Sequence, residues 1–256
     1  MTKVLIVGDT HGDPQFVSNI HRAARDHEVE SIIQLGDFGY NFDRNLLASI
    51  GAWLDRDENH SWFWIDGNHD QHDYIEQDIL SVVPNWNKPV AHFHERMFYV
   101  PRGAVFAVGG TNVLGLGGAY SIDKYRRSPG VSWWEQEMIR PSDMLRAVAN
   151  ATRVGQVDVM ITHDAPMSDE LGEMLNGAGY KVDYDSAANR AALTRVVDEV
   201  RPQRLYHGHY HHRYQTVYTT PEGWDVDVEG IGANVNPRGY IDHTAIQNHN
   251  YIIEEW

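Results

Sequence analysis

The sequence has no cysteine among its 256 residues, which excludes disulfide bonds and thiolate chemistry and is typical of a cytoplasmic protein. It also lacks any apolar run near the roughly 20 residues that a transmembrane helix needs. Residues 1–3 lead directly into a short apolar stretch and do not resemble a signal peptide. We therefore expect a cytoplasmic protein with no membrane partner.

Basic residues are scarce, since 21 Lys and Arg stand against 36 Asp and Glu and give a formal net charge of -15. Such a surface repels nucleic acid and anionic membranes, so we expect no stable nucleic-acid binding, although a local cationic site can lie inside an acidic protein. Internal repeats and linker-like tracts are absent as well. Because the length suffices for a large core, the sequence predicts a single domain over residues 1–256.

The first third of the sequence alternates regularly between strand and helix patterns. Strands are expected over 3–7, 31–35 and 62–65, a helix over 14–27, and a second helix, capped by Asn41 or Asp43, through residue 55. This alternation predicts a parallel or mixed sheet with crossover helices. Further strands are expected over 97–100, 104–108, 112–116, 157–161 and 204–206, and helices over 141–151 and 186–200. Pieces at 214–218, 224–228 and 251–252 would complete a second sheet, and residues 167–185 look like a loop or lid.

Glycine-flanked polar clusters follow the first three predicted strands, and histidines follow two later ones. The clusters are Gly8-Asp9-Thr10-His11, Gly36-Asp37-Phe38-Gly39, Gly67-Asn68-His69-Asp70, Thr162-His163 and His207-Gly208-His209-Tyr210-His211. Ligands of α/β sheets bind beyond the carboxyl ends of the strands. Residues i and i+2 of an extended segment point to the same side, so Asp9 with His11, and His209 with His211, can each reach one point. The pattern predicts a metal site at this edge.

Taken in order from residue 8 to residue 211, these clusters resemble the five motifs of the calcineurin-like metallophosphoesterase superfamily. The stretch Gly117-Gly118-Ala119-Tyr120-Ser121-Ile122-Asp123, followed by Trp133-Trp134, is similar to its small bacterial and phage members. The resemblance implies an α/β (α+β) fold in which two mixed β-sheets pack as a sandwich flanked by helices. It also implies two divalent ions. One would be held by Asp9, His11, Asp37 and His211, and the other by Asp37, Asn68, His163 and His209.

Asp37 is the natural bridge, because two closely spaced ions need a shared ligand. Mixed imidazole, carboxylate and amide ligands suit Mn, Fe, Ni, Co or Zn. Two such ions carry more positive charge than their carboxylates and a bridging hydroxide neutralise, so the site keeps a net positive charge that attracts phosphate. The hydroxide would attack phosphorus. By the resemblance, His69 would donate a proton to the leaving oxygen. Asp70 would keep His69 oriented, or would act only as a helix cap.

Arg126 and Arg127 follow the glycine-rich loop and are candidate phosphate contacts, because a guanidinium matches phosphate oxygens; the alternative is that both are solvated. His207 is expected to support the ligands or to pack beside them; the alternative is that it takes a ligand role itself, because it shares the face of His209 and His211. The predicted activity is hydrolysis of small phosphodiesters such as cyclic nucleotides. A phosphomonoesterase or protein phosphatase is the alternative, although Gly39-Tyr40-Asn41 and Asp70 stand where the Ser/Thr phosphatase branch has Asp-Arg-Gly and Glu. A non-catalytic metal-binding scaffold is the rival from another class. The sequence does not specify the oligomeric state.

Overall fold

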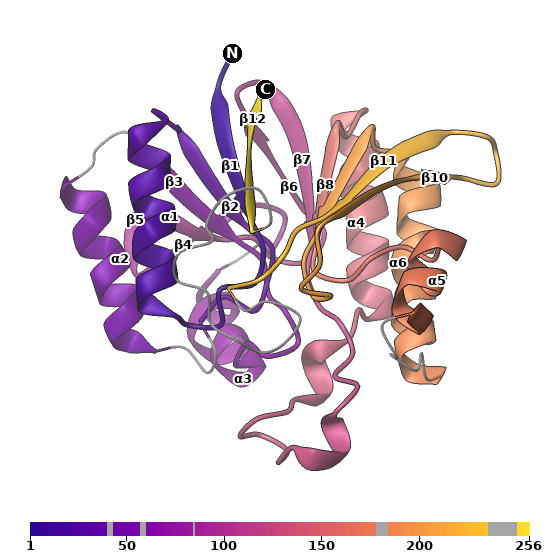
Figure 1. Cartoon of the computed structure of the whole chain (residues 1–256), viewed down its shortest axis with the longest axis horizontal. Helices are drawn as coiled ribbons and strands as arrows, with labels where there is room; N and C mark the ends of the chain where they lie inside the picture. The colour runs from indigo at the N-terminus through magenta and orange to yellow at the C-terminus, as the bar shows by residue number, and fades with distance from the viewer. Residues whose placement is uncertain (40–42, 57–59, 84, 178–183, 235–249) are drawn as a thin grey trace.

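The computed structural model describes residues 1–39, 43–56, 60–83, 85–177, 184–234 and 250–256. Its centre is a pair of six-stranded mixed sheets that pack face to face, with helices on both outer sides (Figure 1). The predicted fold class, two mixed sheets flanked by helices, is confirmed. No helix within the described ranges is long and apolar enough to span a lipid bilayer.

The first sheet has the strand order β12-β1-β2-β3-β5-β4. Its strands are β1 (Lys3–Val7), β2 (Ser31–Gln34), β3 (Ser61–Trp64), β4 (Val90–His92), β5 (His94–Tyr99) and β12 (Tyr251–Glu255). The four strands from β1 to β5 in this order are parallel, and the edge strands β12 and β4 are antiparallel to their neighbours. Helices α1 (Pro14–Asp26) and α2 (Arg44–Arg56) cover its outer face. The Asp13 carboxylate accepts two N–H groups at the start of α1, and Asp43 accepts one at the start of α2. The alternative cap, Asn41, lies outside the described residues.

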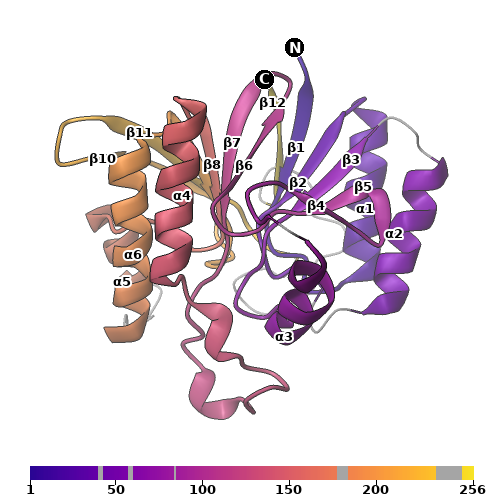
Figure 2. The same ribbon diagram turned by 180° about the vertical axis from the view of Figure 1, so that it is seen from behind.

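The second sheet has the order β10-β11-β9-β8-β7-β6 and repeats the plan of the first. Its strands are β6 (Ala104–Val108), β7 (Thr111–Leu116), β8 (Val159–Thr162), β9 (Arg204–His207), β10 (Tyr214–Thr219) and β11 (Asp225–Gly230). Strands β7, β8, β9 and β11 are parallel, and β6 and β10 are antiparallel edges. Figure 2 shows α4 (Pro141–Val154) and α6 (Tyr184–Val200) on the outer face of this sheet.

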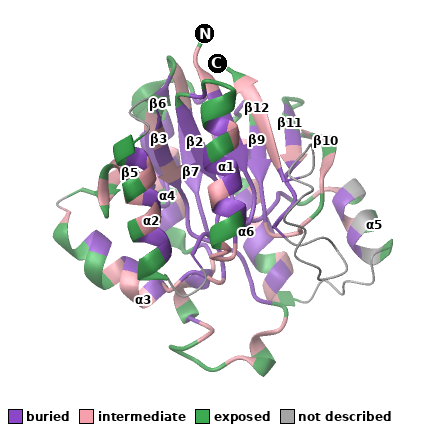
Figure 3. Ribbon diagram, turned by 60° about the vertical axis from the view of Figure 1, so that its left-hand side comes forward, coloured by how far each residue is buried: buried purple, intermediate pink, exposed green. Residues whose placement is uncertain are grey.

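Side chains alternate between two buried faces in each sheet. On β1, Val4 and Ile6 join the apolar cluster between the sheets, whereas Leu5 and Val7 join the cluster beneath α1 and α2. On β8, Val159 and Ile161 face the first sheet and Met160 lies in the cluster with α4 and α6. Parallel strands covered on both faces read as continuous apolar runs. Figure 3 shows this buried centre between exposed outer helix faces.

Two expectations about the chain are wrong. Residues 251–252 belong to β12, which pairs with β1 in the first sheet instead of completing the second. The register sets Ile252 opposite Ile6, so Ile252 packs in the cluster between the sheets. The expected loop or lid over 167–185 contains the helix α5 (Asp169–Gly177), whose Leu171 and Leu175 lie one turn apart and pack together. Residues 178–183 of that segment lie outside the described residues.

Two regions carry helical turns that the sequence patterns did not predict. After β3, α3 (His72–Tyr74) continues through a π-helical turn over Ile75–Ile79 and a 3-10 turn over Leu80–Val82. Between β7 and α4 the chain leaves the sandwich and forms a lobe below it in Figure 1, with 3-10 turns at Lys124–Arg126 and Glu135–Glu137. This lobe begins at the same end of the sheets where the parallel strands finish.

Candidate metal centre

The predicted ligands come from loops that follow the ends of β1, β2, β3, β8 and β9. All five strands run in the parallel part of their sheets, and their carboxyl ends meet at one end of the sandwich, opposite the two termini in Figure 1. The structure thereby brings together side chains that are far apart in sequence, from Asp9 to His211.

Backbone conformation at this end is unusual. In the described part of the chain, seven residues other than glycine have positive φ, and four of them are predicted ligands: His11 (47°), Asp37 (52°), His209 (67°) and His211 (53°). Residues held in this sparsely populated region cluster at functional sites. The expectation of extended segments is wrong at His11, His209 and His211, whose positive φ marks left-handed turns. Asp9 and His11 still approach each other, whereas His211 lies beside Asp9 and His209 lies beside His163.

One group of side chains surrounds the Asp9 carboxylate. Oδ2 of Asp9 lies 3.0 Å from Nε2 of His211 and 3.9 Å from Nε2 of His11. The same His11 nitrogen lies 3.6 Å from Oδ2 of Asp37. Asp9, His11 and His211 each place a ligand atom within 4.8 Å of the others. This group matches the first predicted metal position.

A second group surrounds the other oxygen of Asp37. Oδ1 of Asp37 lies 3.5 Å from Nε2 of His163, and that nitrogen lies 3.1 Å from Oδ1 of Asn68. Asp9, Asp37 and His163 also have ligand atoms within 4.8 Å of one another. The predicted fourth ligand, His209, is half-buried beside His163 with a ring-centre distance of 5.1 Å. Asp37 thus faces both groups, one with each carboxylate oxygen.

Two glycines are required by the close approach of the loops. A Cβ atom on Gly67 would lie 2.2 Å from Oδ1 of Asp37, and one on Gly208 would lie 2.2 Å from Oδ1 of Asp9. Neither position has room for a side chain. The glycines of the Gly-Asn-His and Gly-His-x-His stretches therefore let neighbouring loops bring their ligands together.

Hydrogen bonds on the far side of the rings orient the imidazoles. Nδ1 of His163 lies 2.7 Å from the carbonyl oxygen of Leu35, so Nδ1 carries the proton and donates it while Nε2 faces Asn68. Nδ1 of His11 lies 2.8 Å from Oδ1 of Asn234. Such outer partners fix the tautomer of metal-binding histidines. Asn234 was not predicted, because it follows a late strand without a motif, and the structure alone reveals its contact.

The donor set attracts positive charge. Burial alone would lower the pKa of His11, but the hydrogen bond and charge of Asp37, with Asp9, raise the pKa of its imidazole to about 9. The same competition raises the pKa of His163 to about 10. Oδ2 of Asp9 is buried and has no partner with hydrogen-bond geometry among the described residues. Carboxylates and imidazoles that point at one another in this way form a site that a divalent cation satisfies.

Arg127, but not Arg126, lies at this site. Nη1 of Arg127 is 2.6 Å from Nδ1 of His69, and the guanidinium is held by two hydrogen bonds of 2.6 and 2.9 Å to Asp123. Burial lowers the pKa of His69; the Asp37 carboxylate opposes this, and the charge of Arg127 adds to the lowering. Arg126 is exposed, and its guanidinium lies 5.2 Å from the ring centre of Tyr125. The structure therefore separates the two predicted substrate contacts.

Asp70 binds backbone N–H groups and does not contact His69 as predicted. Its carboxylate accepts hydrogen bonds from the N–H groups of Phe38, Gly39 and Gly67, at 2.8 to 3.3 Å. These amides belong to the two loops that carry Asp37 and Asn68. The position beside the His69 ring predicted for Asp70 is occupied by Arg127. The geometry assigns Asp70 to loop architecture.

His207 turns away from the ligand cluster. Its Nε2 lies 2.5 Å from the hydroxyl of Tyr214, and its Nδ1 lies 2.9 Å from the carbonyl oxygen of Gly208. Burial lowers its pKa to about 4, so the ring is neutral at pH 7. Both nitrogens are engaged, which agrees with the predicted supporting role.

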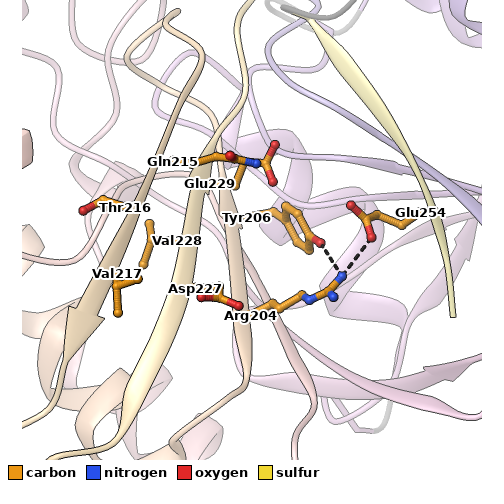
Figure 4. A pocket seen from close by; sticks show the side chains of 9 residues that line it. All are labelled: Arg204, Tyr206, Gln215, Thr216, Val217, Asp227, Val228, Glu229 and Glu254. Carbon is orange, nitrogen blue, oxygen red and sulfur yellow. Dashed lines mark hydrogen bonds and ion pairs between the residues drawn. The ribbon is translucent and has the colours of Figure 1, made fainter.

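A cavity of about 250 Å³ opens over the ligands. Its walls are Asp37, Asn68, His69, Ser121, Ile122, Asp123, Arg127, Leu175, Ser186, His209, Tyr210 and His211. A larger hollow of about 510 Å³ lies along β9, β10, β11 and β12 (Figure 4). There Arg204 donates to Glu254 at 2.8 Å. Arg204 begins β9, whereas the histidines follow its end, so this larger hollow is separate from the metal centre.

The sequence model of the calcineurin-like phosphoesterase family matches residues 2–213. The chain is a calcineurin-like phosphoesterase. The matched range holds all seven predicted metal ligands, and family membership places this phosphoesterase among the metal-dependent phosphoester hydrolases.

Solved structures share the fold of this phosphoesterase at low identity. The protein TT1561 of Thermus thermophilus is 13% identical with a TM-score of 0.58, over 93% of this chain and 95% of that one. A dimetal phosphatase from Danio rerio is 12% identical with a TM-score of 0.55, over 98% of this chain and 91% of that one. Among curated proteins no sequence matches this phosphoesterase.

Proposed function

We propose that this chain hydrolyses small phosphodiesters, nucleotides and cyclic nucleotides among them, at a centre of two divalent ions. The observation that carries the proposal is the single cavity of about 250 Å³ shared by metal ligands, His69 and the guanidinium of Arg127. Two ions held by these ligands, together with an arginine and a histidine around the same space, would bind a phosphoester and assist the departure of its leaving group.

The ligands fit the two ions in the manner that the family resemblance implies. Asp9, His11 and His211 would hold one ion, Asn68, His163 and His209 the other, and Asp37 would contact both. Bound there, two ions such as Mn, Fe, Ni, Co or Zn would polarise the phosphoryl oxygens and acidify a water molecule. The other steps, phosphate binding and proton donation, would be carried out by the protein's side chains.

Arg127 would bind a phosphoryl oxygen that the ions leave free. Its guanidinium is already oriented by two hydrogen bonds to Asp123, so little side-chain entropy is lost on binding. A phosphate anion is a stronger acceptor than a neutral imidazole, so it would draw Arg127 from the His69 ring. With the guanidinium withdrawn and the Asp37 carboxylate nearby, the His69 ring would take up a proton from solvent and, as an imidazolium, donate the proton at Nε2 to the departing ester oxygen.

The cavity walls favour a diester over a monoester. Ile122, Leu175 and Tyr210 line the cavity beside the polar groups, and Leu175 is only 3% exposed. A monoester presents only anionic oxygens on the sides of phosphorus away from its leaving group. A diester carries a second organic substituent, which apolar and aromatic side chains accommodate. A nucleoside is a substituent of this kind.

The test is a comparison of bis(p-nitrophenyl) phosphate, p-nitrophenyl phosphate and 2′,3′- and 3′,5′-cyclic nucleotides with metal-free protein reloaded with Mn, Fe, Ni, Co or Zn. We expect two ions per chain and a higher kcat/KM for the diesters than for the monoester. A higher kcat/KM for the monoester would replace the proposal by a phosphomonoesterase. Two bound ions without turnover of any ester would support the scaffold alternative.

A further inference from the structure

The Asn68 side chain has two chemically different ends, and only one of them can bind a cation. Its Oδ1 lies 3.1 Å from Nε2 of His163, and its Nδ2 donates a 3.0 Å hydrogen bond to Oγ of Ser121. An amide turned by 180° about its last bond would present an NH₂ group to His163 and to a bound ion. Binding at this position therefore depends on which way the amide faces.

Ser121 and Glu137 determine which partner donates in the hydrogen bond between Asn68 and Ser121. One oxygen of Glu137 accepts the backbone N–H of Ser121 at 2.8 Å, and the other accepts the hydroxyl of Ser121 at 2.8 Å. An ionised carboxylate only accepts hydrogen bonds, so the single hydroxyl proton of Ser121 points to Glu137 when that side chain is ionised. Oγ of Ser121 is then left as an acceptor for Asn68. The chain of donors runs one way, from Asn68 through Ser121 to Glu137.

Glu137 is itself tightly fixed. It is 1% exposed, and its backbone carbonyl accepts a 3.0 Å hydrogen bond from Nη2 of Arg102. The same guanidinium binds Asp66 through bonds of 2.6 and 2.9 Å, and Asp66 lies two residues before Asn68. The protruding lobe and the end of β3 are thus joined twice, once through Arg102 and once through Ser121.

We propose that Glu137 and Ser121 are positioning residues that set the direction of the Asn68 amide and thereby the affinity of the metal position formed by Asn68, His163 and His209. This inference rests on the proposed two-ion centre. Ser121 in the glycine-rich stretch and Glu137 after Trp133-Trp134 would then act together to support metal binding.

Glu137→Gln is the sharpest variant because it keeps shape and reverses one hydrogen bond. The oxygen of the substituted amide must accept the N–H of Ser121, so the NH₂ group of that amide faces Oγ and donates to it. The hydroxyl proton of Ser121 then turns toward Asn68 and favours the flipped amide. Ser121→Ala removes the acceptor altogether, and Ser121→Thr keeps the hydroxyl.

The experiment is calorimetric Mn²⁺ titration of the metal-free full chain, with metal counting and thermal unfolding of the same samples. Glu137→Gln and Ser121→Ala should weaken one of the two ions by about 10–100-fold, the usual effect of losing an outer partner. The other ion should bind as in wild type, and Ser121→Thr should restore both. Asn68→Ala defines the largest effect. Glu135→Gln is the matched control, since Glu135 lies in the same 3-10 turn and is exposed.

Three results would overturn the inference. Unchanged affinities in Glu137→Gln and Ser121→Ala would show that Asn68 needs no such support. Equal weakening of both ions, together with a lower unfolding temperature of the metal-free variants, would show general damage to the fold. A wild type that binds fewer than two ions would contradict the proposed function as well, whereas the first two results contradict only the inference.

Discussion

Arg127 and His69 lie side by side in the cavity, with Nη1 of the guanidinium 2.6 Å from Nδ1 of the imidazole, although they are 58 positions apart in the sequence. The contact places the lobe between β7 and α4 in the site. We expect Arg127→Ala to raise KM for diesters about tenfold or more, because a charge-assisted hydrogen bond contributes roughly 1.5–3 kcal/mol. Arg127→Lys should recover part of the loss. Steady-state kinetics and metal counting measure both effects.

The control for Arg127 is its exposed neighbour. Arg126→Ala removes the same charge from the same turn without touching the cavity, so its kinetic constants should equal those of wild type. Equal effects of the two substitutions would mean that only the net charge of the lobe matters.

His69→Ala should leave two ions bound and lower kcat by about a hundredfold for substrates with poor leaving groups, as expected for loss of a general acid. The loss should shrink for nitrophenyl esters, whose leaving group departs without a proton. Kinetics with a series of aryl and alkyl esters tests this. The same loss across the whole series would show that His69 only positions the substrate.

Asp70→Asn should reduce both stability and metal content. The substitution removes an acceptor from the buried N–H groups of Phe38, Gly39 and Gly67, and each donor left unpaired costs roughly 1–3 kcal/mol. Urea unfolding and metal counting are the measurements, with the exposed Asp78→Asn as control. If Asp70→Asn lowered turnover while stability and metal content stayed at wild-type values, the predicted catalytic pairing with His69 would be restored.

The buried imidazole of His72 makes stability depend on pH. Burial lowers its pKa to about 4, although Asp66 opposes the shift and Arg102 supports it. In the unfolded chain a histidine has a pKa of about 6.5. Below that pH the unfolded state binds a proton at His72, whereas the folded state binds it only near pH 4. The free energy of unfolding therefore falls as the pH drops from about 6.5 to about 4.

His72→Asn removes this proton uptake. Between pH 7 and pH 5 the metal-free wild type should lose about 2 kcal/mol more unfolding free energy than the variant. Urea titrations at both pH values measure the difference, and the exposed His212→Asn should behave like wild type. Parallel losses in wild type and His72→Asn would show that His72 takes up its proton equally in both states.

The gathering of the candidate metal ligands at one place could be predicted because each belongs to a short local sequence pattern. Each ligand stands directly after a strand, and parallel strands bring such positions to one end of a sheet. The conformation that joins them could not be predicted in the same way. Positive φ at His11 and His211 arises from loop packing, and the extended geometry expected from their i, i+2 spacing is absent.

Residues outside the motifs needed the tertiary structure. Arg126 and Arg127 are adjacent and equivalent in sequence, and in the structure Arg127, which pairs with Asp123, lines the cavity while Arg126 is exposed. Asn234 contacts the site through His11, and Glu137 contacts it through Ser121 beside Asn68, each across a long stretch of chain. The strand β12 was expected in the wrong sheet because its partner, β1, lies at the other end of the sequence.

The proposed two-ion centre depends on Asp37 serving both ions at once, with Oδ2 3.6 Å from His11 and Oδ1 3.5 Å from His163. Metal counting on wild type and Asp37→Ala, after reloading with Mn²⁺ and gel filtration, measures this. We expect two ions in wild type, none retained in Asp37→Ala, and two in the control Asp43→Ala, whose carboxylate caps α2. Two ions per chain in Asp37→Ala would show that Asp37 bridges no metal pair.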